Sequence, residues 1–339
     1  MLPPTLPKYK NLSIPPGMPA RTSWNLFSTP THQDSLGTLN QITTFVTLSA
    51  ASEIRSGVSV SLNWGLENLD CAGFGRQKLE RKVVDWRKEG LKAAGSEEKE
   101  GGGGDGGLFS FDDELRFNTQ IGSQWDGLRH WGHSKTGFYY QGIHHNDLLA
   151  TPHLGIEHIS QKGGLCTRGI LIDYPLYCSQ NNISFNPMST HSIPLSTLTS
   201  ILASTSTIPR AGDILLLRTG FLSTYHTLTP SERTSQITNG SAWIGVLGDE
   251  AMVEWLWDTG IAAVAADNMG FECWPPVNKE WMLHDHLLAC LGMPIGELWD
   301  LEGLAKECER NGRWSFFLTS APLNVRGGIA SPPNALAVF

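Results

Sequence analysis

Runs of apolar residues alternate along the chain with segments of helical periodicity. Residues 58–64 alternate between apolar and polar positions, which predicts a half-buried strand. Continuous apolar runs predict further strands over 169–174, 213–221, 261–267 and 314–320. Helical spacing and capping signals predict helices over 43–55, 249–259 and 281–291. This alternation predicts a mixed α/β fold in which helices cover at least part of the sheet.

Two segments depart from this pattern. The first 35 residues are rich in Pro, Ser and Thr, and we expect them to run as irregular, extended backbone over the surface. Residues 78–107 begin as a charged stretch and end in a glycine run, a composition typical of a flexible insertion. Since no internal repeat is visible, we expect residues 1–339 to form a single domain that carries this insertion.

Composition excludes several classes of protein. The 339-residue chain is 40% hydrophobic and 17% charged, so it has enough apolar material for a core. With 25 Lys and Arg against 33 Asp and Glu, its net charge is −8, which argues against nucleic-acid or membrane partners. It has no apolar run of about 18 residues, and its first residues lack an apolar stretch, so we expect neither a membrane span nor a signal peptide. The six cysteines are dispersed without a C-x-x-C pair, so we expect a cytoplasmic protein with reduced thiols.

Polar groups with catalytic potential concentrate in residues 118–145. This segment holds glutamines, histidines, an aspartate and an arginine among large aromatic side chains. Burying so many polar groups is costly unless each of them is paired, so a functional site or a hydrogen-bonded loop would explain the segment. Weaker candidates are His284 with Glu297, and the two carboxylates of the 267–272 fragment that follows a predicted strand.

The segment resembles the signature H-x-G-T-H-x-D-x-P-x-H of the cyclase family of metal-dependent hydrolases, which includes kynurenine formamidase and isatin hydrolase. The matching residues run from Gln120 to His130 (QIGSQWDGLRH), with Asp126 and His130 in register. Further stretches similar to the family's filamentous-fungal branch are LGTLNQIT, GDILLLRTGF, AADNMGFECWPP and GMPIGELWDL. Only residues 78–107 look added to this pattern.

The resemblance implies a swivelling β/β/α domain with a mixed, barrel-like sheet, usually assembled as a homodimer. It also implies a divalent metal (Mn, Mg or Zn), and it assigns the role of general acid and base to His130. By position, the metal ligands are expected at Gln120, Gln124, Asp126, His284 and Glu297.

Two departures from the signature affect the metal site. Gln120 and Gln124 stand where the family has ligand histidines, and an amide oxygen is a weak, hard donor compared with imidazole. Three interpretations stay open: a weak, oxygen-rich metal site, a metal-independent enzyme that relies on His130, or a ligand-binding protein without activity.

The leading interpretation is a hydrolase that opens a cyclic amide, lactone or acyl-amide bond with activated water. His130 is a suitable general acid and base because its ordinary pKa lies near neutrality. Arg129 is expected to stabilise an oxyanion or a substrate carboxylate, and Asp126 to assist catalysis. The aromatic residues favour an aromatic or lactone-like small molecule. The alternatives are a metal-independent isomerase, cyclase or dehydratase of secondary metabolism, and a noncatalytic relative.

Overall fold

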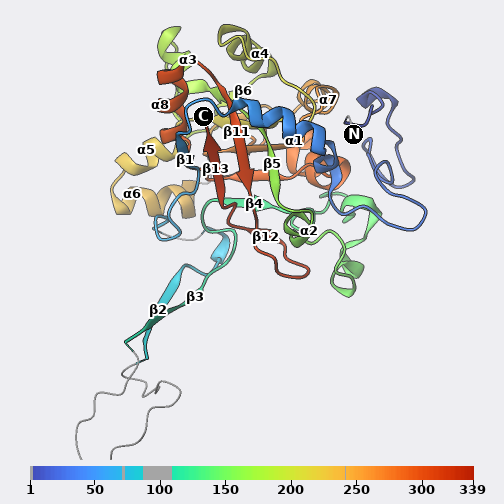
Figure 1. The fold of residues 1–339 in the computed structure, drawn as a ribbon, viewed down its shortest axis with the longest axis horizontal. Helices are drawn as coiled ribbons and strands as arrows, with labels where there is room; N and C mark the ends of the chain where they lie inside the picture. The colour runs from blue at the N-terminus through green and yellow to red at the C-terminus, as the bar shows by residue number, and fades with distance from the viewer. Residues whose placement is uncertain (1–2, 71–72, 87–108, 241) are drawn as a thin grey trace, which may run out of the picture.

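One curled, mixed β-sheet runs through the molecule in the computed structural model, which describes residues 3–70, 73–86, 109–240 and 242–339 (Figure 1). Its four central strands are parallel, and the strands that flank them on both sides are antiparallel. In spatial order the strands are β1 (Ser59–Ser61), β13 (Ala335–Val338), β11 (Ser315–Ser320), β5 (Leu165–Asp173), β7 (Ile214–Arg218), β9 (Ala263–Ala266), β10 (Ile295–Glu297), β4 (Gln124–Asp126) and β12 (Ala330–Ser331). The sheet therefore joins segments from residue 59 to residue 338.

Alternate residues of the central strands enter two hydrophobic cores, one on each face of the sheet. On β5, Ile170 and Ile172 belong to the larger core and Leu171 to the smaller one. The same alternation holds on β7, where Leu215 and Leu216 lie in opposite cores. Because strand side chains point to the two faces in turn, a continuous apolar run is what a sheet covered on both faces requires.

Helices cover both faces of the sheet. The larger core receives apolar side chains of α4, α5 and α7, and the smaller core receives those of α8. The helices are α1 (Thr44–Ala50), α2 (Glu157–Gln161), α3 (Tyr174–Gln180), α4 (Leu195–Ser204), α5 (Phe221–Thr227), α6 (Pro230–Ser235), α7 (Glu250–Asp258) and α8 (Glu302–Asn311). The predicted α/β class is confirmed.

Each long strand expected from an apolar run is present, but the first 35 residues differ from the expectation. Their backbone is irregular, yet Tyr9, Leu12 and Met18 are buried in the larger core. The predicted helix over 281–291 is broken into the short turn η8 (Lys279–Trp281) and the helical segment η9 (Asp285–Leu291). This break matters because it positions His284 at the start of η9.

The expected insertion begins in regular structure. β2 (Glu80–Asp85) pairs with β3 (Phe111–Arg116) in an antiparallel hairpin that projects from the body (Figure 1). The expected insertion therefore contains a strand near its start, at residues 80–85. Residues 87–108, which make up most of the expected insertion, lie outside the described residues.

No helix in the described part of the chain is long and apolar enough to cross a membrane. The cysteines that the structure describes carry free thiols, and all of them except Cys166 are buried.

Candidate active site

The register between β4 and β10 builds the floor of the candidate site. Gln124 lies opposite Glu297 and Asp126 opposite Ile295, so the three polar side chains share one face of the sheet. Trp125, between the two site residues of β4, points to the other face and packs against Trp299 at 4.8 Å between ring centroids. The alternation of a short strand thus separates the polar site from the core.

Two glutamines connect the carboxylates of the floor. Gln120 Nε2 donates to Asp126 Oδ1 at 2.7 Å and lies 3.0 Å from His130 Nδ1. Gln124 Nε2 donates to Glu297 Oε2 at 2.5 Å and to Gln120 Oε1 at 3.2 Å. Both amides therefore contribute N–H donors to the carboxylates.

His284 completes the cluster from the other side. Glu272 Oε1 lies 2.7 Å from His284 Nδ1, and its carboxylate also accepts hydrogen bonds from the backbone N–H groups of Leu283 and His284. Glu272 therefore fixes the orientation of the ring. His284 Nε2 faces inward, 3.3 Å from Glu297 Oε1 and 3.7 Å from Asp126 Oδ2.

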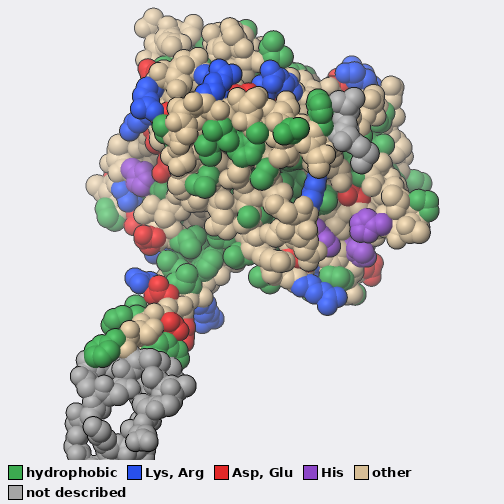
Figure 2. All heavy atoms as spheres, in the orientation of Figure 1, with side chains coloured by type: hydrophobic (Ala, Val, Ile, Leu, Met, Phe, Trp, Pro, Cys, Tyr) green, Lys and Arg blue, Asp and Glu red, His purple; other side chains and the backbone are tan. Residues whose placement is uncertain are grey.

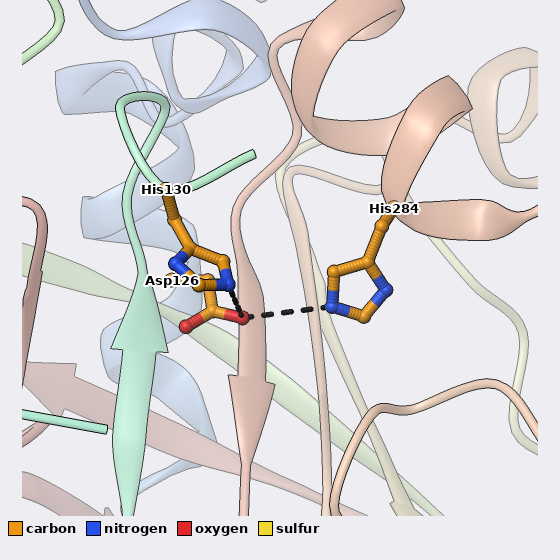
Figure 3. A group of neighbouring side chains, drawn as sticks. All are labelled: Asp126, His130 and His284. Atoms are coloured by element: carbon orange, nitrogen blue, oxygen red, sulfur yellow. Dashed lines mark ion pairs between the residues drawn. The ribbon is translucent and has the colours of Figure 1, made fainter. Parts of the chain in front are cut away.

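Asp126 Oδ2 lies between two imidazole rings and has no hydrogen-bond partner among the described residues, although it is buried (Figure 3). His130 Nε2 is 3.8 Å away and His284 Nε2 is 3.7 Å away. One ligand atom from each of Asp126, His130 and His284 lies within 4.8 Å of the others, so the three residues form a possible metal-binding triad. An unpartnered buried carboxylate oxygen beside imidazole nitrogens fits a divalent cation.

Burial and mutual charge set the protonation of these groups. Burial opposes a charged His284, but the carboxylates of Asp126, Glu272 and Glu297 outweigh it and raise the pKa of His284 well above its usual value. Burial, helped by the charge of Asp126, raises the pKa of Glu297 to about 7. Burial lowers the pKa of His130, which is therefore neutral at pH 7.

A largely apolar cavity opens beside the cluster, with about 110 Å³ of room for the centres of water molecules. His130, His284 and Glu297 line it, together with Arg76 and Glu272. Its apolar wall consists of Leu69, Phe74, Trp131, Trp243, Met269, Trp274, Met282 and Leu298. Such a cavity, apolar with a few convergent polar groups, is typical of a small-molecule site.

The structure brings six of the seven predicted site residues, His130 among them, into this cluster, and one of the six has a different role from the one expected. Gln120, Gln124, Asp126, His284 and Glu297, the expected metal ligands, all meet there. Gln120, however, was expected to offer its amide oxygen to a metal, and that oxygen instead accepts a hydrogen bond from Gln124. Gln124 Oε1 is buried without a described partner and keeps the potential to bind a cation.

Arg129 lies outside the cluster, in contrast to the position that its expected role requires. Its guanidinium donates to the carbonyl oxygens of Leu148, Thr151 and His153, and Arg129 is not among the described residues that line the cavity. It therefore holds together the loop that follows His130. Adjacency in sequence was a poor guide because successive residues after β4 point in different directions.

Sequence reasoning missed Arg76 and the tryptophans that come from distant segments, and it named Glu272 only as a weaker candidate. Glu272 belongs to the carboxylate pair that was noticed after β9, but its partner Asp267 has a different role. Asp267 accepts hydrogen bonds from the backbone of Thr219 and Gly220. No sequence signal connects Arg76 to the site, because the contact depends on how the chain returns to β4.

The fold is a curled mixed sheet, and a buried cluster of carboxylates and imidazoles lies near one of its edges. These features agree with a comparison of the sequence with known protein families. The family model described as "Putative cyclase" matches residues 26–273. The chain therefore belongs to the cyclase family.

Solved structures agree with this family. A crystal structure described as a novel cyclase is 28% identical and superposes with a TM-score of 0.77, covering 94% of this chain and 99% of that chain. Isatin hydrolase A from Ralstonia solanacearum is 16% identical with a TM-score of 0.55, covering 88% and 98%. An isatin hydrolase bound to the product analogue thioisatinate gives the same identity and TM-score, covering 88% and 99%. No curated protein matches the chain significantly.

Proposed function

We propose that the protein is a hydrolase that opens a cyclic amide, lactone or acyl-amide bond of a small aromatic or lactone-like molecule. The observation that carries this proposal is the unpartnered, buried Asp126 Oδ2 between His130 and His284, two residues that line an apolar cavity. In the reaction, a water oxygen adds to the acyl carbon, the bond to nitrogen or oxygen breaks, and the leaving atom takes up a proton.

Asp126, His284 and Glu297 are the residues best suited to hold a divalent cation, whether Zn²⁺, Mn²⁺ or Mg²⁺. A cation held there lowers the pKa of water and polarises a carbonyl group. Glu272 supports His284 as a ligand, because a carboxylate on the far ring nitrogen fixes the ring and raises its basicity. His130 has an amide in that position and is the weaker ligand.

We assign proton transfer to His130. Its ring lines the cavity, and Gln120 holds it beside Asp126. Since burial lowers its pKa, the ring is neutral at pH 7 and ready to take up the proton that the attacking water loses. The same ring then returns the proton to the leaving nitrogen or oxygen.

The test is hydrolysis of three probes: isatin, dihydrocoumarin and N-formylaniline. We expect at least one to be turned over, activity to be lost after chelation and restored by one of the three cations, and His130→Ala to reduce turnover by about 10²–10⁴. His130→Ala should keep the native metal content. Loss of metal in this variant would instead make His130 a ligand, and activity that survives chelation would contradict the metal-dependent mechanism.

One observation favours a second candidate, a metal-independent isomerase, cyclase or dehydratase. The N–H groups of Gln120 and Gln124 already stabilise the carboxylates of Asp126 and Glu297, as a cation otherwise would. Turnover of a probe without water incorporation, unaffected by chelation, would support this candidate.

We also propose a homodimer in the cytoplasm, with a role in secondary metabolism. The projecting hairpin β2–β3 supports the assembly, since Val83, Phe111 and Leu115 are exposed on one of its faces. An isolated two-stranded hairpin is at best marginally stable in water, so a partner surface would stabilise it.

A further inference from the structure

Arg76 brings a permanent positive charge to the cavity. It is partly buried, and its Nη1 donates to the carbonyl oxygen of Gln120 at 3.1 Å. The guanidinium also lies 5.0 Å from the centroid of the Phe74 ring, and both residues line the cavity. These contacts are with an uncharged carbonyl group and an uncharged ring, so they fix the position of the guanidinium without compensating its charge.

The carboxylates of the cavity wall already have their own partners. Glu272 binds His284 and two backbone N–H groups, and Glu297 binds Gln124 and His284. Arg76 is therefore the group of the described wall best placed to receive an additional anion. An arginine presents a planar fork of N–H donors that matches a carboxylate.

The charge of Arg76 also reaches the reacting groups. Burial is the main cause of the low pKa of His130, Asp126 opposes it, and the charge of Arg76 adds to it. Arg76 donates a hydrogen bond to the backbone of Gln120. The side chain of Gln120 in turn contacts Asp126 and His130, so a single residue connects Arg76 to these two groups.

The aromatic part of the cavity wall suits a flat ring. Trp243 and Trp274 stack at 5.6 Å between ring centroids with an interplanar angle of 14°. The ring of Trp131 is held by a hydrogen bond from its Nε1 to Asp285 Oδ1 at 2.7 Å. Aromatic surfaces fixed in this way favour stacking or edge contacts with an aromatic ligand.

We infer that Arg76 binds a carboxylate group of the substrate, and that the preferred substrates are therefore aromatic compounds with a carboxylate near the scissile bond. This inference rests on the proposed function for the identity of the pocket. In this role Arg76 selects substrates by their charge. If Arg76 only anchored residues 73–76 on Gln120, its loss would weaken the binding of charged and uncharged ligands equally.

The test compares two ligands of nearly the same shape, the anion 2-aminobenzoate and the uncharged 2-aminobenzamide, by calorimetric titration of the native protein. We expect 2-aminobenzoate to bind more tightly, and Arg76→Gln to weaken its binding about tenfold while changing the dissociation constant of 2-aminobenzamide less than twofold. Glutamine retains an N–H donor for the Gln120 carbonyl. The matched control is Arg116→Gln, which removes the same charge from an exposed side chain outside the cavity, and it should change neither constant.

Three outcomes would overturn the inference. Equal weakening of both ligands by Arg76→Gln would make the residue a structural anchor. A preference for 2-aminobenzoate that survives Arg76→Gln but disappears on chelation would place the carboxylate on a cation. Absence of binding by either ligand would exclude this ligand class. None of these results depends on turnover, so failure of the proposed hydrolysis is recognised separately by the probe assays.

Discussion

At the scale of single residues, the two glutamines decide how the site differs from the family signature. An imidazole nitrogen in either place would present a lone pair to a cation. Gln120 and Gln124 instead donate N–H groups to Asp126 and Glu297. The carboxylates are thus stabilised by hydrogen bonds that do not require a metal, which should weaken zinc binding.

The variant Gln120→His/Gln124→His should therefore bind zinc much more tightly than the native protein. Two added imidazoles with Asp126 form a His₂Asp set, and His284 or Glu297 can supply a fourth ligand. Zinc content by elemental analysis and zinc affinity by competition with a chelating dye would measure this. The matched control is Gln161→His/Gln180→His, which adds two histidines at exposed helical positions. Stoichiometric zinc in the native protein would show that the glutamines do not weaken the site.

Glu272 should act on metal affinity through His284. Glu272→Gln removes the charge that orients the ring, and loss of such a partner typically lowers metal affinity about 10–100-fold. The control is Glu302→Gln, which removes a carboxylate bound to Arg218 away from the cavity. Both variants should lower the thermal midpoint, but only Glu272→Gln should change the zinc dissociation constant. Equal zinc affinities in the two variants would contradict this role.

Zinc binding should release protons and weaken as the pH falls. In the metal-free protein the carboxylates around His284 raise its pKa well above the usual value, and burial raises that of Glu297 to about 7. Both groups must lose a proton before they bind zinc, so affinity should rise with pH through neutrality. Calorimetry in buffers of different ionisation enthalpy counts the protons released. A pH-independent affinity between pH 6 and 8 would mean that His284 is not a ligand.

At the scale of elements, the length of a strand decided whether the sequence revealed it. β5 and β7 are long and apolar because both faces are covered, and the apolar runs predicted them. β4 and β10 have three residues each, and β4 reads Gln-Trp-Asp. Nothing local in a polar three-residue segment predicts a strand, because its partners lie about 170 positions away in sequence. The site is built on these two strands.

The hairpin allows a direct test of the expected insertion. Strands β2 and β3 are in register up to the hydrogen bond from Trp86 N to Ser110 O. A short turn in place of residues 90–106 should therefore keep the hairpin and change the thermal midpoint by less than about 2 °C, which corresponds to roughly 1 kcal/mol for a protein of this size. Circular dichroism on heating measures this. A larger decrease would show that the segment contributes to folding.

At the scale of the whole molecule, the hairpin extends beyond the body and brings hydrophobic side chains with it (Figure 2). The register places Val83, Phe111 and Leu115 on one face, with Val84 on the other. Exposed apolar residues on a projecting element are typical of an interaction site. The proposed dimer provides a surface that would cover them.

Sedimentation velocity should detect this dimer in the native protein and a monomer in Val83→Asp/Phe111→Asp. Each added carboxylate would have to be buried in the interface, which is costly without a partner. Lys82→Asp, on the opposite face of the hairpin, is the control and should remain dimeric. Unchanged sedimentation of the double variant would move the interface elsewhere, and a monomeric native protein would contradict the dimer itself.

The sequence by itself determined the α/β class, the long buried strands, and a site around Asp126 with its partners His130, His284 and Glu297. The strands were predictable because a run of apolar residues indicates a strand that is buried on both faces. The site was predictable because its residues match a family signature. The placement in a fungal branch stays a prediction. The tertiary structure alone decided that the glutamines donate hydrogen bonds to the carboxylates, that Arg129 faces a loop, that Glu272 orients His284, and that Arg76 lines the cavity. Such contacts depend on side-chain direction and on segments tens to more than a hundred residues apart, which are brought together only when the sheet curls and its edge strands pair.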